Sequence, residues 1–196
     1  MGTWYEKGIF YHMYPLGLTG APKHNDQTEV TDRMKELEEW IPHMRSLGCN
    51  SLYIGPLFES STHGYDTRDY KLVDRRLGAN DGFRHFVKAC HETGIRVVVD
   101  GVFNHTGSNS RYFNAEGFYP ELGAAQSQDS PYFDWYSFHP WPTDYDAWWG
   151  VRTLPAVNEE APSYRDFIVR SQDSVVRHWL RQGADGWRLD VADELP

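Results

Sequence analysis

The stretch GADGWRLDVADELP, residues 183–196, alternates polar and apolar side chains at its centre. Arg188 and Asp190 are separated by Leu189, and this period of two is typical of a β-strand. Both polar side chains should therefore project from the same side of the strand. A guanidinium this close favours the ionised form of the carboxylate. An ionised carboxylate at a strand end is suited to act as a nucleophile, although the pattern taken alone favours a structural ion pair.

A second polar cluster, DGVFNHTG at residues 100–107, follows the mainly apolar run at residues 95–99. That run is short enough to be a buried parallel strand. Asp100, Asn104 and His105 then fall at its carboxyl end. In a sheet of parallel strands this is the end at which functional sites are built.

The rest of the chain alternates strands with helices. Strands are predicted at 8–15, 51–54, 95–100 and within 183–196, and helices from 31 or 32 to 48, from 81 to 94 and from 162 or 163 to 183. We expect Pro42 to kink or shorten the first helix, and residues 59–76 to form a polar loop. Alternation of this kind indicates parallel strands joined by helical crossovers, which is the α/β class.

Residues 106–160 interrupt this alternation. They are rich in Gly, Ser, Asn and Pro, show no long periodic stretch, and contain Trp135, Trp141, Trp148 and Trp149. A segment this long between a strand and its helix is more often functional than a plain connection. Aromatic residues make up 15% of the chain, which fits sugar stacking and ordinary packing equally well.

Composition limits the classes of function. A length of 196 residues indicates one domain that can bury a core. The net charge of −9 and the absence of a Lys/Arg run argue against a nucleic-acid partner. No apolar run reaches the length of a membrane span, and the first residues lack the regions of an export signal. We therefore expect a cytoplasmic protein with no membrane partner. Cys49 and Cys90 belong to no ligand-spaced cluster and are expected to be reduced.

Together the two polar stretches resemble the α-amylase family of glycoside hydrolases. Residues 100–105 match the family's Asp-x-x-x-Asn-His motif at the end of the third barrel strand, and residues 186–190 match its Gly-x-Arg-x-Asp motif at the end of the fourth. The resemblance implies an α/β fold, a partial TIM (β/α)₈-type barrel of the first four strands with an irregular insertion after the third. It divides the chain into the first part of the barrel (1–105), an inserted excursion domain (106–160), and the third helix and fourth strand (161–196).

The resemblance also implies roles for single residues. Asp190 would be the nucleophile that attacks the anomeric carbon, and Arg188 would hold it ionised and oriented. His105 would hydrogen-bond the sugar hydroxyls, while Asp100 would brace Arg188 or the strand end. Tyr65, in an HGYD stretch, would give the sugar an aromatic floor, although an ordinary packed loop aromatic stays open as an alternative.

No cofactor is required by this resemblance, and calcium is implied only in some members of the family. Asn104 matches a calcium ligand there, but a hard cation needs several oxygen donors. Residues 104–106 also fit the glycosylation pattern, yet a strand end inside a barrel mouth is a poor acceptor. Within the family, residues 148–150 and 154–158 are similar to the closing motif of the neopullulanase and cyclomaltodextrinase branch, from which Ala156 and Val157 depart.

The implied function is retaining hydrolysis of α-glucans such as starch, maltodextrin, pullulan or cyclodextrin. This reaction needs a second carboxylic acid about 5 to 5.5 Å from the nucleophile. In the family that Glu follows the fifth strand, so we expect the 196-residue chain alone to be inactive. The alternative is a non-catalytic α-glucan-binding or assembly fragment derived from the family. Two open barrel edges would also favour self-association.

Overall fold

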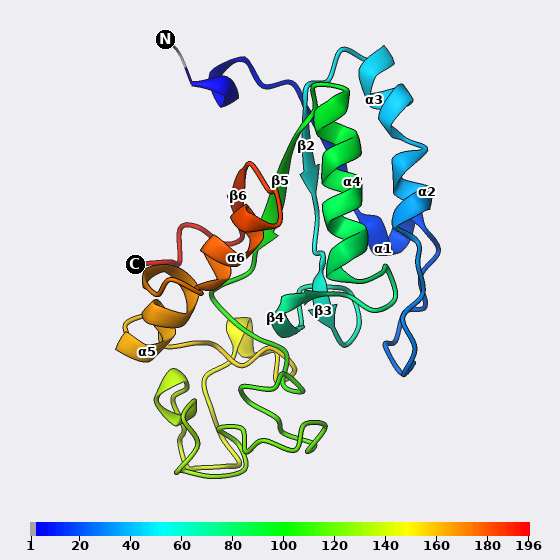
Figure 1. Ribbon diagram of the computed structural model, residues 1–196. Coiled ribbons are helices and arrows are strands. Elements are labelled where there is room, and N and C mark those ends of the chain that lie inside the picture. Colours follow the sequence, from blue (N-terminus) through cyan, green and yellow to red (C-terminus); the bar gives the residue numbers. More distant parts are fainter. Residues whose placement is uncertain (1–2) are drawn as a thin grey trace.

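The computed structural model describes residues 3–196 and contains a four-stranded parallel sheet (Figure 1). Its strands are β1 Phe10–Met13, β2 Ser51–Ile54, β5 Arg96–Gly101 and β6 Gly186–Leu189. They lie in the order β1–β2–β5–β6, and each neighbouring pair is parallel. The strands occur at the four predicted places, which confirms the α/β class. The first is shorter than the predicted range 8–15.

The helices lie between these strands. They are α1 Pro15–Leu18, α2 Met34–Glu38, α3 Ile41–Ser46, α4 Asn80–Glu92, α5 Pro162–Arg165 and α6 Val175–Arg181. A π-helical turn, Asp166–Arg170, continues α5, and short 3₁₀ turns occur at Trp4–Lys7, Phe133–Trp135 and Trp148–Gly150. Within residues 3–196, no helix combines the length and apolar character needed to cross a membrane.

The two faces of the sheet differ in burial. Leu52 of β2 and Val97 of β5 are partners in register and are completely buried in the main hydrophobic core. The helix α4 runs alongside these strands and adds its apolar face to the same core (Figure 1). Tyr53 is only half-buried because side chains alternate between faces along a strand. The face that carries Tyr53 is therefore the one available for a site.

Residues 59–76, predicted to be a polar loop, instead contain an antiparallel pair of strands. These are β3 Phe58–Ser60 and β4 Thr67–Val73. The prediction was wrong because β4 buries charged side chains whose partners lie far along the chain. Asp69, for example, is buried and accepts a 2.7 Å hydrogen bond from Arg111.

Two predicted helices are interrupted. The first begins at Met34 and breaks after Glu38, and Pro42 lies in the first turn of α3, so the expected effect of Pro42 is confirmed. The third was predicted as one continuous helix, which is wrong. Its chain leaves helical geometry after the π-helical turn and restarts at α6, where the Ser174 hydroxyl accepts a hydrogen bond from the Arg177 backbone N–H.

Residues 106–160 form an irregular segment beyond the carboxyl ends of the strands (Figure 1). Isolated bridges join His105 to Ala156 and Ala147 to Pro155. Much of the aromatic content of the segment is packed internally, as in the buried residues Tyr112, Phe113, Trp135 and Tyr136. Trp149 differs from these because its side chain is exposed.

Candidate active site

Arg188 joins two carboxylates at the carboxyl ends of β5 and β6. Asp100 and Arg188 are partners in the register of these strands. Nη1 of Arg188 donates to Oδ1 of Asp100 at 3.0 Å and also pairs with Oδ1 of Asp190. The resemblance implied the contact with Asp190 and gave the contact with Asp100 as one of two alternatives; both contacts are present. The same nitrogen therefore serves the two acids.

Asp190 is held at the start of a sharp turn. Its backbone N–H donates to the carbonyl of Gly101 at 3.0 Å, which ties the end of β6 to the end of β5. The next residue, Val191, has a φ of +43°, a value that β-branched residues rarely adopt. The chain thus leaves the strand direction immediately after Asp190, whose side chain stays beside Arg188.

Burial and ion pairing act in opposite directions on this group. Burial alone would lower the pKa of Arg188, but hydrogen bonds to Asp190 and Asp100 outweigh it and raise that pKa above its usual value. Burial raises the pKa of Asp100, and hydrogen bonds from Tyr53 and Arg188 partly oppose the increase. A guanidinium that stays protonated compensates the charge of the carboxylates around it.

Tyr53 is a member of the site that the sequence analysis missed. Its hydroxyl donates to Oδ2 of Asp100 at 2.5 Å, and its ring stacks on His12 with centroids 4.3 Å apart. The Cζ atom of Arg188 lies 5.6 Å from the same ring. The structure places Tyr53 on the face of β2 opposite to the buried Leu52, but no local sequence pattern distinguishes it from a core tyrosine.

His105 and Asp190 line one cavity of about 320 Å³, together with His63, Tyr65, Trp148, Leu154 and Val191. Nε2 of His105 is buried and has no hydrogen-bond partner within residues 3–196. Burial lowers the pKa of His105, and the charge of Asp190 partly opposes the decrease. Since a buried polar atom without a partner is costly, Nε2 is suited to contact a ligand hydroxyl.

The loop that carries Tyr65 is fixed by its neighbours. Gly64 has a φ of +99°, and a Cβ atom at this position would lie 2.4 Å from Cβ of Pro56, so the position requires glycine. Asp66 accepts a 2.7 Å hydrogen bond from the Thr62 hydroxyl. The tyrosine ring is therefore presented to the cavity from a rigid loop.

The structure thus brings five of the predicted residues together: Tyr65, Asp100, His105, Arg188 and Asp190. Asn104, the sixth, lies beside them: its Oδ1 is 3.2 Å from Nδ1 of His105, and its Nδ2 donates to Glu159 at 3.3 Å. Within residues 3–196, no group of three or more His, Cys, Asp or Glu side chains is placed to hold a metal ion. Because calcium takes six to eight oxygen ligands, these side chains alone do not fit a calcium site at Asn104.

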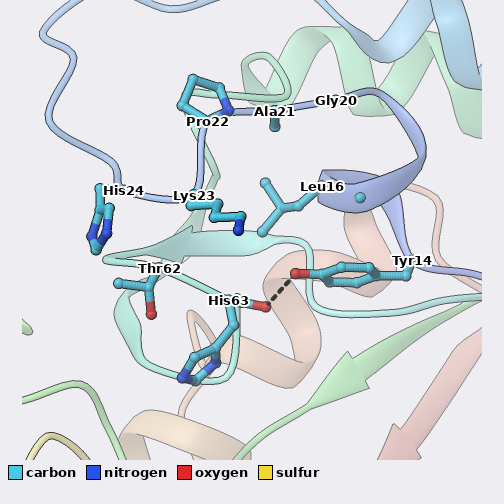
Figure 2. A pocket seen from close by; sticks show the side chains of 10 residues that line it. Tyr14, Leu16, Gly20, Ala21, Pro22, Lys23, His24, Thr62 and His63 are labelled. Carbon is cyan, nitrogen blue, oxygen red and sulfur yellow. Dashed lines mark hydrogen bonds between the residues drawn. The ribbon is translucent and has the colours of Figure 1, made fainter.

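A second cavity, of about 630 Å³, lies beside the Tyr65 loop (Figure 2). Tyr14 lines it and donates from its hydroxyl to the carbonyl of His63 at 3.0 Å. Leu16, Ala21 and Pro22 contribute apolar surface. This cavity is larger than the one beside Asp190 but contains none of the catalytic candidates.

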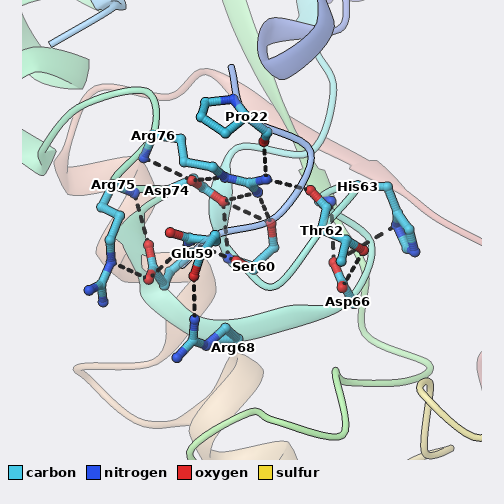
Figure 3. Close-up of polar contacts among 12 residues, drawn as sticks. Pro22, Glu59, Ser60, Thr62, His63, Asp66, Arg68, Asp74, Arg75 and Arg76 are labelled. Carbon is cyan, nitrogen blue, oxygen red and sulfur yellow. Dashed lines mark hydrogen bonds and ion pairs between the residues drawn. The ribbon is translucent and has the colours of Figure 1, made fainter. Parts of the chain in front are cut away.

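The loops around this second cavity are held by Arg76, which is completely buried (Figure 3). Its guanidinium makes two hydrogen bonds to Asp74, Nε to Oδ1 at 2.8 Å and Nη2 to Oδ2 at 2.7 Å. Nη1 donates to the carbonyls of Pro22 at 2.9 Å, Lys23 at 3.4 Å and Thr62 at 2.7 Å. One side chain thus fixes the loop after α1 and the loop before β4 relative to each other.

The chain matches a known protein family and is similar to known enzymes. The model of the family described as alpha amylase, catalytic domain, matches residues 24–196. The chain is 37% identical over 181 residues to an amylopullulanase of Thermoanaerobacterium saccharolyticum, covering 83% of this chain and 14% of that protein. It is 30% identical over 217 residues to a cyclomaltodextrinase of a Bacillus species, covering 98% of this chain and 37% of that protein.

The chain also superposes on solved enzyme structures. The cyclic alpha-maltosyl-(1→6)-maltose hydrolase of Arthrobacter globiformis, in complex with maltose, superposes with a TM-score of 0.80 at 31% identity, covering 97% of this chain and 46% of that one. The debranching enzyme of Nostoc punctiforme gives a TM-score of 0.80 at 28% identity, covering 98% and 43%. The chain therefore spans less than half the length of these relatives.

Proposed function

This chain belongs to the α-amylase family of glycoside hydrolases, and we propose that its site supplies the nucleophile for retaining hydrolysis of α-glucans. The observation that carries the proposal is the position of Asp190. It lines the same cavity as Tyr65 and His105, while Arg188 binds only its Oδ1 oxygen. Its second oxygen is available to attack a sugar bound in the cavity.

In the proposed reaction Asp190 attacks the anomeric carbon of a glucosyl unit. The bond from that carbon to the leaving oxygen breaks, an ester to Asp190 forms, and water then cleaves the ester. His105 would donate to or accept from a sugar hydroxyl through Nε2, and Tyr65 would support the ring. Arg188 would keep the carboxylate oriented throughout.

Three carboxylates near Asp190 already accept hydrogen bonds, which makes each of them poorly suited to protonate the leaving oxygen. Asp100 is hydrogen-bonded at both oxygens, to Arg188 and to Tyr53. Glu194 accepts from two indoles, and Glu159 accepts from Asn104. We therefore propose that residues 3–196 bind the glucan and hold the nucleophile but do not hydrolyse an unactivated glycoside by themselves.

The proposed substrates are maltodextrins, pullulan and cyclodextrins. The names of the relatives support this range, since they include an amylopullulanase, a cyclomaltodextrinase and a hydrolase of a cyclic maltosyl-maltose. A non-catalytic glucan-binding or assembly role for this chain is the alternative, favoured by the hydrogen bonds that Asp100, Glu159 and Glu194 already accept.

An activated substrate tests the proposal because its leaving group needs no acid to protonate it. In an α-glucosyl fluoride whose ring carries a second fluorine, the nucleophile displaces fluoride without help from an acid. The product is an ester that is hydrolysed slowly. We expect mass spectrometry to find one glucosyl adduct, on the peptide that contains Asp190, and none in Asp190→Asn. An adduct on another residue would contradict the assignment. Binding of maltoheptaose without any adduct would favour the non-catalytic alternative.

A further inference from the structure

Three aromatic rings form a ladder that leads out of the cavity beside Asp190. His105 is buried and stacks on Trp148, with centroids 5.3 Å apart and planes inclined by 28°. Trp148 stacks in turn on Trp149, at 5.2 Å and 22°. Trp149 is 80% exposed, more than any other large hydrophobic side chain in residues 3–196. The ladder thus runs from a site residue to solvent.

The loop that carries the two tryptophans is bonded to the segment that follows β5. The Trp148 backbone N–H donates to the carbonyl of Leu154 at 2.9 Å, which closes the loop. The Thr106 backbone N–H donates to the carbonyl of Pro155 at 3.1 Å, and His105 forms a bridge with Ala156. The rings therefore have fixed positions relative to His105 before any ligand arrives.

Glu194 fixes the edges of both indoles. Nε1 of Trp148 donates to Oε2 of Glu194 at 3.2 Å, and Nε1 of Trp149 donates to Oε1 at 3.3 Å. Glu194 belongs to the turn that follows Asp190, and its backbone N–H donates to the carbonyl of Val191 at 2.9 Å. The nucleophile and the aromatic ladder are thus connected through one short segment.

One face of Trp149 is left bare. Among the described residues its ring stacks only on Trp148. Its backbone has a φ of +49°, in the left-handed region that a tryptophan rarely adopts and that persists only where the surroundings impose it. A single exposed hydrophobic side chain is ordinary on a protein surface. Trp149 is not ordinary in this sense, because its indole edge and its backbone are both fixed. Its ring also continues the wall of a binding cavity.

We propose that the outer face of Trp149 is a stacking platform for a distal glucosyl unit of an α-glucan, at least two units along the glucan from the one that occupies the cavity beside Asp190. This inference rests on the proposed function. A glucan fits better than an apolar partner, because a pyranose has an apolar C–H face for the indole and hydroxyls for Glu194 and solvent. The platform would favour longer chains over maltose.

Calorimetric titration of the chain with maltoheptaose and with maltose tests this proposal. We expect Trp149→Ala to weaken maltoheptaose binding roughly tenfold and to change maltose binding by less than about twofold. Trp149→Phe should retain most of the affinity because it keeps an aromatic face. Phe118→Ala is the matched control, since Phe118 is also an exposed aromatic of the same irregular segment but lies over Arg68.

The outcomes separate the two proposals. Unchanged maltoheptaose binding in Trp149→Ala, with a normal thermal melt, would overturn the platform and leave the proposed function standing. An equal loss of affinity for maltose and maltoheptaose would also overturn it, because the effect would then lie in the cavity. A wild-type chain that binds neither sugar would overturn the proposed function and the platform with it.

Discussion

The hydroxyl of Tyr53 lies 2.5 Å from Oδ2 of Asp100, on a strand adjacent to the one that carries the acid. Asp100 is almost completely buried, and Arg188 holds its other oxygen. A buried carboxylate is stable only when its oxygens are hydrogen-bonded or paired with a cation. Tyr53 and Arg188 together meet that requirement, so the orientation of Arg188 toward Asp190 depends on a residue of β2.

Tyr53→Phe should lower the free energy of unfolding by about 1 to 3 kcal/mol at neutral pH, because it leaves Oδ2 of Asp100 without its donor. It should also raise the pKa of Asp100 further. When an acid has a higher pKa in the folded chain than in the unfolded chain, stability is lost above the folded pKa and none is lost below the unfolded pKa. The stability deficit of the variant should therefore shrink as the pH falls. Urea unfolding at several pH values measures it. Tyr11→Phe is the control, since that hydroxyl makes no hydrogen bond within residues 3–196. A deficit independent of pH would contradict the link to Asp100.

Arg188→Lys should not support formation of the glucosyl adduct on Asp190. One nitrogen of Arg188 makes both carboxylate contacts, but the planar guanidinium also lies over the ring of Tyr53. A lysine ammonium is compact and strongly hydrated, and cannot keep that stacked position. The rate of adduct formation, followed by mass spectrometry, is the measurement. Near-normal labelling would show that a positive charge alone is sufficient.

Asp185→Asn should destabilise the chain in a pH-dependent way. The carboxylate accepts hydrogen bonds from Arg96 at 2.7 Å, from the Val97 backbone N–H at 2.9 Å and from His91 at 2.6 Å. Burial alone would raise the pKa of Asp185, but these contacts outweigh it and lower the pKa below its usual 3.8. An acid whose pKa is lower in the folded chain than in the unfolded chain contributes stability at pH values above its unfolded pKa. This contribution is lost as the pH falls through its folded pKa.

We therefore expect a loss of about 1 to 3 kcal/mol for Asp185→Asn at neutral pH and a smaller loss below the usual pKa of the acid. Chemical denaturation at neutral and acidic pH compares the two. A difference that grows on acidification would contradict the assigned direction of the shift.

The chain should self-associate through its outer strands. β1 and β6 each pair on one side only in the described sheet, and they carry exposed Phe10 and Leu189. Edges of this kind promote strand pairing between copies. Sedimentation velocity should show concentration-dependent association that Leu189→Lys reduces. Leu180→Lys, on the exposed side of α6, is the matched control. A monodisperse monomer at all concentrations would contradict the prediction.

Calcium should not stabilise this chain. Among the described acids, Glu159 is the side-chain partner of Asn104. The side chains of these two residues supply too few oxygen ligands for the ion. We expect added calcium to change the Tm by less than about 1 °C. An increase that depends on calcium and disappears in Asn104→Ala would show a site completed by other ligands.

The positions of the candidate residues could be predicted from the sequence better than the structure around them. Asp100, His105 and Asp190 could be placed because each lies at or beyond the carboxyl end of a strand whose period or apolar character is local. Tyr53 could not be placed, because a tyrosine in a strand has the same local sequence pattern whether it lines a site or packs in a core. The β3–β4 pair was missed because buried charges such as Asp69 depend on Arg111, which no local period reveals. The exposure of Trp149 depends on the path of an irregular loop and has no signal in composition.

Arg76 binds carbonyl oxygens of Pro22, Lys23 and Thr62, and not their side chains. Every residue type presents the same main-chain acceptor, so this anchorage does not depend on which amino acids occupy the two loops. The side chains that line the second cavity, such as Lys23 and His24, are therefore free to vary while the loops keep their places. A library randomised at such positions would sample new binding surfaces on an unchanged backbone, next to the loop that presents Tyr65.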